Sequence, residues 1–220
     1  PFDGSAYPDQ CNLMNYLVNA EMIVVTKDIE TVFDLEGKSF APSFQGSALY
    51  DNILNYLRVL GITVDVFDGS LEDIVNAMKD GRIVGYGKSA NGFGPDASML
   101  DVSSSVDVHV IGYTQEQADQ ILADDPVNTA LYTFTVLPAG SAFDNEELVT
   151  SVVVAAYFSK NGTSEDMQYR VTKAAWASVQ EAAEQANYAG GMGRTIDETL
   201  STVEAMPLCP GAQRYYDELG

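Results

Sequence analysis

The sequence predicts an α/β protein in which helices cover a mostly parallel sheet, and three observations favour this fold class. Short apolar, β-branched runs alternate along the chain with segments of helical periodicity. Several of these helical segments begin at a serine or threonine and end at a glycine, as capped helices do. With 220 residues, 46% of them hydrophobic, the chain can bury a sizeable core.

The expected elements follow one another in alternating order. Strands are expected at 21–28, in a segment ending at Pro42, and at 62–69, 82–87, 106–113, 131–140 and 151–160. Helices are expected at 45–61, 70–81, 114–125 and 163–186, around Asp197 to Glu204, and at the C-terminus.

Two expected helices have recognisable starts. Ser70, with Asp73 three residues later, forms a capping box, and Thr163 with Asp166 resembles one at the start of the longest helix. The apolar face of this longest helix is expected to carry Met167, Val171, Ala175 and Val179, with Tyr169 and Trp176 alongside.

The C-terminal helix is expected to begin at Pro210-Gly211-Ala212. Tyr215 and Tyr216 lie within it and are adjacent, so they cannot face the same neighbour. We expect one ring to pack on the protein while the other keeps its hydroxyl in water.

The charge balance excludes several classes of partner. Asp and Glu number 32 against 11 Lys and Arg, which gives a formal net charge of −21. Such a surface repels phosphate backbones and anionic lipid, so we expect no nucleic-acid binding and no docking on anionic membranes. The acidic residues are scattered, which suits a strongly solvated surface in a salty or extracytoplasmic setting. No apolar run reaches the eighteen or so residues of a membrane span.

Cys11, Cys209 and the single histidine, His109, show no metal-site spacing. The scattered carboxylates show none either, so we expect no metal and no cofactor. A disulfide between the two cysteines is one alternative if the compartment is oxidising. Two buried free thiols explain the count equally well, and the sequence leaves both alternatives open.

The most informative stretch is PSFQGSALYD, from Pro42 to Asp51, a strand-to-helix turn that contains Gly46 and Ser47. Glycine lets a backbone approach a ligand closely, and a helix N-terminus presents unpaired N–H groups to an anion. Ser47 adds a hydroxyl donor. The alternative is that Ser47 only caps the helix, and the two roles are compatible.

Ser47 fits a hydrolase nucleophile poorly. Gly46-Ser47-Ala48-Leu49 lacks the second glycine of a nucleophile elbow. His109, the sole candidate base, falls in an apolar strand pattern typical of a structural histidine. We therefore expect that the protein is not an enzyme.

A second candidate segment is glycine-rich and spans 85–98, where a loop is expected after a strand. It has neither the Walker A order nor a G-x-G-x-x-G that opens a helix. Loops at the carboxyl ends of parallel strands commonly contact ligands. Lys88 is expected there either to pair with a carboxylate or simply to be solvated, with Ser89 beside it.

Several motifs, taken together and in order, resemble a known family. They are DLEGK (34–38), the Gly46-Ser47 helix start, Asp80-Gly81, Pro138-Ala139-Gly140, YRVTKA (169–174) and PLCPGAQRYYDE (207–218). Over essentially its whole length the chain resembles the TAXI family, the extracytoplasmic solute-binding proteins of tripartite ATP-independent periplasmic (TRAP) transporters.

The resemblance implies a type II periplasmic-binding-protein-like fold, in which two α/β lobes close on a small carboxylate such as glutamate, another amino acid or an organic acid. It also implies TRAP permease membrane subunits as partners and a periplasmic or extracytoplasmic location. The expected ligand-binding residues are Ser43, Gln45, Gly46, Ser47, Lys88 and Ser89. The family's Gly-Ser-Gly-Thr start continues here with Ala48 and Leu49, Cys209 replaces a histidine, and Phe143 replaces a tyrosine.

The resemblance places lobe two at 34–135 and lobe one at 1–33 and 136–220. Lobe one is expected to be incomplete, since family members carry roughly a hundred further residues before this point, comparable to half of a small domain. A ligand-sensing effector domain of the same fold class is the alternative function. An upstream helix-turn-helix would favour the sensor, and an upstream signal peptide the transporter.

Overall fold

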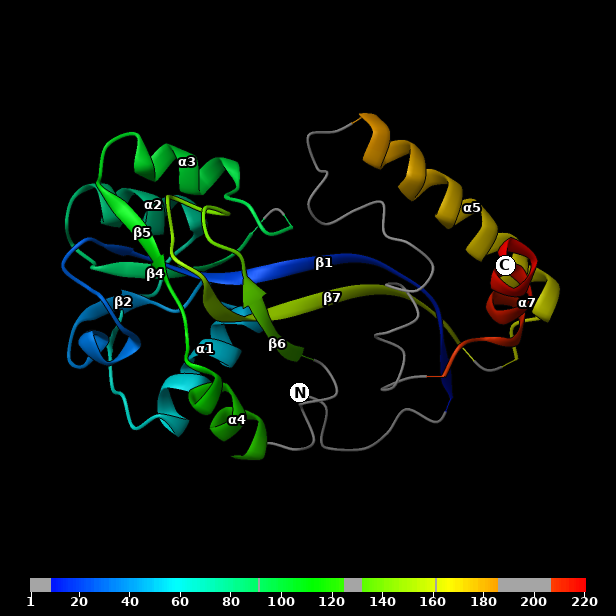
Figure 1. Ribbon diagram of the computed structural model, residues 1–220, viewed down its shortest axis with the longest axis horizontal. Helices are drawn as coiled ribbons and strands as arrows, with labels where there is room; N and C mark the ends of the chain where they lie inside the picture. Colours follow the sequence, from blue (N-terminus) through cyan, green and yellow to red (C-terminus); the bar gives the residue numbers. More distant parts are fainter. Residues whose placement is uncertain (1–8, 91, 125–131, 161, 186–206) are drawn as a thin grey trace. The chain divides into compact units, whose positions relative to one another are not determined.

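The computed structural model describes residues 9–90, 92–124, 132–160, 162–185 and 207–220. Its strands form one seven-stranded mixed sheet (Figure 1). Contacts divide the chain into two compact units. Unit 1 comprises Pro1–Asn19, Val127–Tyr132 and Val153–Gly220, and unit 2 comprises Ala20–Pro126 and Thr133–Val152.

The elements alternate as the sequence predicts. The strands are β1 (Gln10–Thr26), β2 (Ser39–Ala41), β3 (Asp65–Val66), β4 (Gly85–Ser89), β5 (Val108–Ile111), β6 (Tyr132–Leu137) and β7 (Leu148–Lys160). The helices are the 3-10 turn η1 (Val32–Leu35), α1 (Ala48–Val59), α2 (Leu71–Lys79), α3 (Ala97–Ser103), α4 (Gln115–Asp124), α5 (Glu165–Gln185) and α7 (Pro210–Leu219).

The strand order in unit 2 identifies the fold class. β2 pairs in parallel with β3 and β4, whereas β1 pairs antiparallel with both β4 and β5. The strands β3, β2, β4 and β5 therefore run in one direction, and the antiparallel β1 lies between β4 and β5. This is the lobe topology of type II periplasmic binding proteins, so the predicted fold class is confirmed.

The core of unit 2 follows from the alternation of side chains along β1. Met22 and Val24 are buried in a cluster with residues of α2 and α3, which lie together on one side of the sheet (Figure 1). Ile23 pairs with Gly87 of β4, and a Cβ built on Gly87 would meet Ile53 of α1 at 2.2 Å. The opposite face of the sheet therefore packs against α1.

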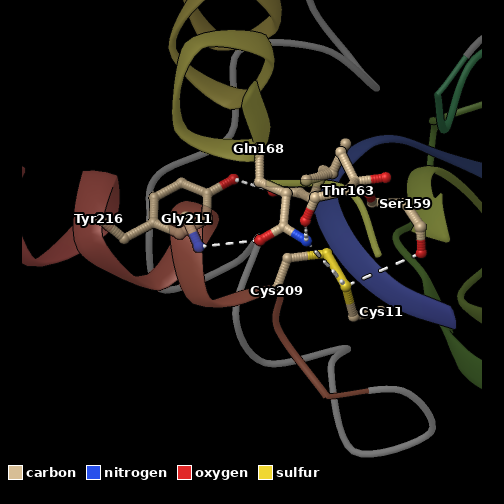
Figure 2. The surroundings of a disulfide bond; sticks show 8 residues. Cys11, Ser159, Thr163, Gln168, Cys209, Gly211 and Tyr216 are labelled. Atoms are coloured by element: carbon tan, nitrogen blue, oxygen red, sulfur yellow. Dashed lines mark hydrogen bonds between the residues drawn. A yellow bond between two sulfur atoms is a disulfide. The ribbon is translucent and has the colours of Figure 1, made fainter. Parts of the chain in front are cut away.

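In unit 1 a disulfide links Cys11 of β1 to Cys209, the residue before α7, with 4.9 Å between their Cα atoms (Figure 2). The alternative of two free thiols is thereby excluded. The Gln168 amide of α5 lies between the disulfide and the start of α7. Its Oε1 accepts from the Gly211 N–H at 3.1 Å, and its Nε2 lies 3.8 Å from the Cys11 sulfur. The bridge and this amide together join β1, α5 and α7.

The structure corrects the start and the buried face of α5. Ser164, rather than Thr163, caps the helix, because its hydroxyl accepts from the Met167 N–H at 3.3 Å. Met167 and Val171 are 47% and 39% exposed. Among the α5 side chains that the structure describes, Gln168, Thr172 and Val179 are buried. The apolar pattern predicted a buried face that starts one residue earlier, at Met167. The polar Gln168 is buried instead, because its side chain accepts a hydrogen bond from Gly211 of α7.

Helix α7 begins at Pro210, as predicted. Tyr215 and Tyr216 are both largely buried, at 7% and 3% exposed, and the Tyr216 hydroxyl donates to the Leu13 carbonyl at 3.1 Å. The Tyr215 ring meets Tyr169 edge-on with 5.7 Å between centroids, and the Tyr216 ring meets Trp176 at 5.9 Å. Adjacent residues on a helix are only about 100° apart, so a broad surface formed by α5 and β1 covers both.

Three further elements differ from the sequence-based expectation. β1 begins at Gln10, well before the expected strand at 21–28. Lys88 and Ser89 belong to strand β4 rather than to a loop, and helix α3 follows within the segment expected to be a loop. The helix expected around Asp197 to Glu204 lies outside the described residues.

Candidate functional site

The turn between β2 and α1 carries most of the predicted site residues. Gly46 has a φ of +84°, a conformation that favours glycine, and it directs the chain into α1. Ser47 is the N-cap of that helix, and its side-chain oxygen accepts from the Tyr50 N–H at 3.2 Å. Ser43 is buried, whereas Gln45 is exposed. The cap interpretation of Ser47 is thus confirmed, and a role in ligand binding stays a prediction.

The end of β4 lies beside this turn. Ala41 of β2 is in register with Tyr86 of β4, so the segments that follow both strands meet at one edge of the sheet. Gly87 permits the close approach, because a Cβ at this position would lie 2.1 Å from the Pro42 carbonyl oxygen. Ser43 to Ser47 and Lys88-Ser89 are therefore neighbouring segments, as the prediction requires.

Lys88, however, already has a counter-ion. Its Nζ lies 2.8 Å from Asp96 Oδ2 and donates to the Ser89 carbonyl at 3.2 Å. Side chains alternate along a strand, so Lys88 lies on the face opposite to Gly87 and α1. Lys88 is therefore not simply solvated, and the carboxylate that it pairs with belongs to the chain itself; pairing with a ligand carboxylate stays a prediction.

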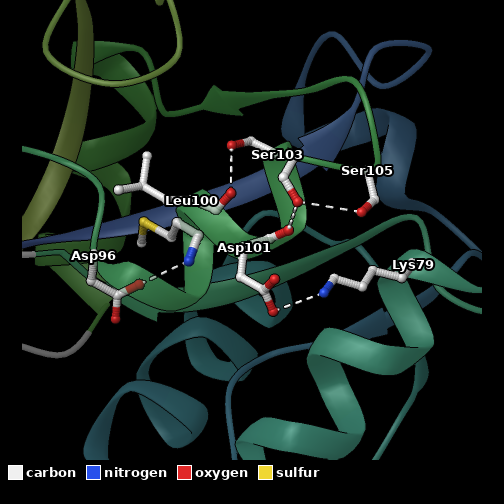
Figure 3. A network of polar contacts seen from close by, with 8 residues as sticks. Lys79, Asp96, Leu100, Asp101, Ser103 and Ser105 are labelled. Carbon is white, nitrogen blue, oxygen red and sulfur yellow. Dashed lines mark hydrogen bonds and ion pairs between the residues drawn. The ribbon is translucent and has the colours of Figure 1, made fainter.

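Asp96 is also the N-cap of α3, where its Oδ1 accepts from the Met99 N–H at 2.9 Å (Figure 3). Burial alone would raise the pKa of Asp96, but hydrogen bonds from Lys88, Ser98 and Met99 together lower it. α3 is further tied to α2 by an ion pair of 2.8 Å between Lys79 and Asp101 (Figure 3). Asp96 therefore remains an anion that neutralises Lys88.

Glu21 is a polar residue near the site that the sequence analysis missed. It is 2% exposed and is in register with Ser89. Ser151 Oγ donates to its carboxylate at 2.6 Å, and Thr150 Oγ1 donates to its backbone carbonyl at 2.6 Å. Its carboxyl group thus ties β1 to β7. The contact lies close to Ala20 and Val152, the residues at which unit 2 begins and ends on these two strands. In the sequence, an acid before an apolar run merely looked like a strand boundary.

Burial raises the pKa of Glu21, and hydrogen bonds from Ser151 and Asn52 of α1 lower it only in part. The buried carboxyl group also acts on a neighbour, since burial and then the charge of Glu21 raise the pKa of Tyr113. Ionised Glu21 is consequently a cost to the folded state.

We expect Glu21→Gln to become more stabilising relative to wild type as the pH rises. The raised pKa means that the folded state holds its proton more tightly than the unfolded state. The stabilising contribution of Glu21 is therefore complete at pH values below its pKa in the unfolded state. It is lost as the pH rises through its pKa in the folded state. Glutamine does not titrate. Urea unfolding between pH 4 and pH 8 measures the difference, and parallel profiles for wild type and Glu21→Gln would contradict the expectation.

An open hollow of about 650 Å³ borders the predicted site. It is lined by Phe44, Gln45, Asp68, Gly69, Ser70 and Leu71, from the β2–α1 and β3–α2 turns. Tyr50 of α1 donates from its hydroxyl to Asp68 Oδ1 at 2.7 Å. This hydrogen bond, followed by burial, raises the pKa of Tyr50 to about 12, so the phenol remains a donor at neutral pH. Gln45 is the predicted site residue that lines the hollow.

Ser47 and His109 do not form a nucleophile–base pair. His109 is on β5 opposite Val25, near the end of β1, and its electrostatic neighbours are Lys27, Asp107 and Glu30. That is the sheet edge opposite to the one where α1 begins. Burial, and next the charge of Lys27, lower the pKa of His109, as for a structural histidine.

Two other kinds of site are absent from the described residues. Among them, no three His, Cys, Asp or Glu side chains gather as metal ligands would. None of the helices in this part of the chain combines the length and apolarity that a bilayer crossing needs.

Solved structures similar to this chain include periplasmic binding proteins. One is an ABC transporter/periplasmic binding protein from Brucella ovis with glutathione bound (11% identity, 84% of this chain and 46% of that chain, TM-score 0.49). Others are the aliphatic sulphonate binding protein SsuA from Escherichia coli (16%, 95% and 59%, 0.44) and an ancestral arginine-binding protein bound to glutamine (16%, 80% and 58%, 0.37). The chain thus spans 46–59% of the length of these proteins. At such identities and TM-scores, the similarities assign no ligand to it.

The family comparison covers more of the chain. The model of the NMT1-like family matches residues 1–220, which is the full sequence, including the β2–α1 turn and the C-terminal helix. The chain therefore belongs to the NMT1-like family.

Proposed function

We propose that this protein is an extracytoplasmic solute-binding protein that captures a small carboxylate-bearing ligand, an amino acid or an organic acid, for a TRAP-type transporter. One observation carries the proposal: the Gly46-Ser47 turn starts α1 at the carboxyl edge of the parallel strands, beside the end of β4. A helix N-terminus leaves backbone amides without intrahelical partners and favours an anion.

In this proposal the ligand's carboxylate lies at the start of α1. Ser43, Gln45, Gly46 and Ser47 contact it from one segment and Ser89 from the next, whereas the Lys88 side chain, paired with Asp96 on the opposite face of the sheet, does not reach it. The proposal assigns these residues to a lobe over 34–135, with 1–33 and 136–220 forming the other lobe. Family membership and the ordered motifs support the transport role. The Cys11–Cys209 disulfide supports an oxidising compartment outside the cytoplasm.

Isothermal titration calorimetry tests the proposal. The panel consists of L-glutamate, L-glutamine, L-alanine and L-leucine, together with the analogue of each in which hydrogen replaces the amino group. At least one of these carboxylates is expected to give a saturable heat with the full chain. No binding by any member of the panel would count against the function.

Ser47→Ala is expected to lower the free energy of unfolding by about 1 kcal/mol, because α1 loses its cap. It is also expected to weaken carboxylate binding about tenfold through loss of a hydroxyl donor next to the anion. Ser164→Ala removes the equivalent cap from α5 and serves as the matched control. It should cost similar stability and leave the dissociation constant unchanged. Equal binding by both variants would limit Ser47 to its capping role.

A further inference from the structure

The hollow beside the predicted carboxylate site contains an acidic side chain that no helix cap requires. Asp68 lies three residues before α2 and two before the N-cap Ser70, close to a helix start where acids often serve as caps. Here Ser70 and Asp73 form the capping box themselves: Ser70 Oγ accepts from the Asp73 N–H at 3.2 Å, and Asp73 Oδ2 accepts from the Ser70 N–H at 3.0 Å. Asp68 is therefore not explained by the start of α2.

A second helix holds Asp68 in place. The hydroxyl of Tyr50, in the first turn of α1, donates to Asp68 Oδ1 at 2.7 Å. Among the described residues, Asp68 has no ion pair and no other hydrogen bond to its carboxylate. One oxygen of the exposed Asp68 carboxylate thus accepts from the Tyr50 phenol, and the second oxygen is available to a ligand.

The remaining walls suit a cation rather than an anion. Among the described residues that line the hollow, Asp68 is the one charged side chain, and no lysine or arginine balances it. Asp51 lies near enough to act electrostatically on Tyr50. The Phe44 ring is 39% exposed, and an aromatic face attracts an ammonium group. A second carboxylate would be repelled here, whereas an amine would gain a charge-assisted hydrogen bond.

We infer that this hollow is an ammonium subsite, with Asp68 as counter-ion and Tyr50 as the residue that positions it, so that the ligand is an amino acid rather than a simple organic acid. The inference rests on the proposed function, because the same ligand places its carboxylate at the start of α1. Gln45 is common to both regions, which makes the two subsites contiguous along one turn.

The test compares amino acids with their deaminated analogues by calorimetry. Each amino acid of the panel (L-glutamate, L-glutamine, L-alanine and L-leucine) is titrated alongside the analogue that has hydrogen in place of the amino group. Asp68→Asn is expected to weaken amino-acid binding by about 10- to 100-fold, the range for loss of a hydrogen bond between charged groups. The analogues should bind Asp68→Asn as well as they bind wild type, or better.

Asp65→Asn is the matched control, since it makes the same charge change on exposed β3, outside the hollow. It should change every dissociation constant less than about twofold, because exposed charges outside contact distance are screened. Tyr50→Phe should weaken amino acids selectively and add little in the Asp68→Asn background, since the two residues act as a unit.

The outcomes separate this inference from the proposed function. Binding of the analogues alone by wild type would overturn the ammonium subsite and keep the solute-binding function. Equal weakening of amino acids and analogues by Asp68→Asn, or equal effects of Asp68→Asn and Asp65→Asn, would also overturn the subsite. Binding of no member of the panel would contradict both.

Discussion

Replacement of both cysteines, as Cys11→Ala with Cys209→Ala, is expected to lower the free energy of unfolding by about 3 kcal/mol. The bridge joins residues 198 positions apart and therefore constrains most of the unfolded chain. It also fixes the start of β1 to the start of α7, where Gln168 bonds to Gly211 at 3.1 Å. Urea denaturation of wild type and the double variant, followed by circular dichroism, measures the difference.

Reductant supplies the control for this prediction. Dithiothreitol should bring wild type to the stability of the double variant and should leave the variant itself unchanged. Alkylation of the denatured, unreduced protein should find no free thiol, because Cys11 and Cys209 are the only cysteines of the chain. Identical unfolding midpoints of wild type with and without reductant would show that the bridge does not stabilise the fold.

Gly87→Ala is expected to destabilise the protein by about 3 kcal/mol, the upper range for overpacking. A Cβ on Gly87 would lie 2.1 Å from the Pro42 carbonyl oxygen and 2.2 Å from Ile53 Cδ1. The first is a backbone atom, so relief requires β4 and the β2–α1 turn to move apart. Because the predicted ligand residues lie on these two segments, the variant should also bind carboxylates more weakly.

Gly61→Ala separates this packing effect from the general cost of replacing a glycine. Gly61 follows α1 with a φ of +75°, and a Cβ there would have no neighbour within 4 Å. Its substitution should cost only about 1 kcal/mol through backbone strain. Chemical denaturation of both variants distinguishes the effects, and a smaller loss for Gly87→Ala than for Gly61→Ala would refute the close-approach argument.

Some residues of the candidate site could be predicted from the sequence, and others could not. The Gly46-Ser47 turn was identified because a strand pattern, a glycine and a cap adjoin one another in sequence. Asp96 was not identified as the partner of Lys88, because the segment that forms α3 was expected to be a loop. Asp68 gave no signal either, because its partner Tyr50 lies 18 residues away in sequence, in helix α1.

The sequence by itself determined the α/β class, the order of the elements and the capping of α1 and α2. These features depend on side chains within a few residues of one another, as in the Ser70–Asp73 box. Residue patterning at periods of two and 3.6 reports burial on one side of an element, and that is enough to place strands and helices.

Only the tertiary structure decided which polar groups are buried and which cysteine alternative holds. Glu21 is buried because Ser151, 130 residues later, supplies its hydrogen bond. Gln168 displaces Met167 from the inner face of α5 because it bonds to the N–H of Gly211. A buried polar side chain is tolerated where a partner satisfies it, and that partner is fixed by the path of the whole chain rather than by its neighbours in sequence.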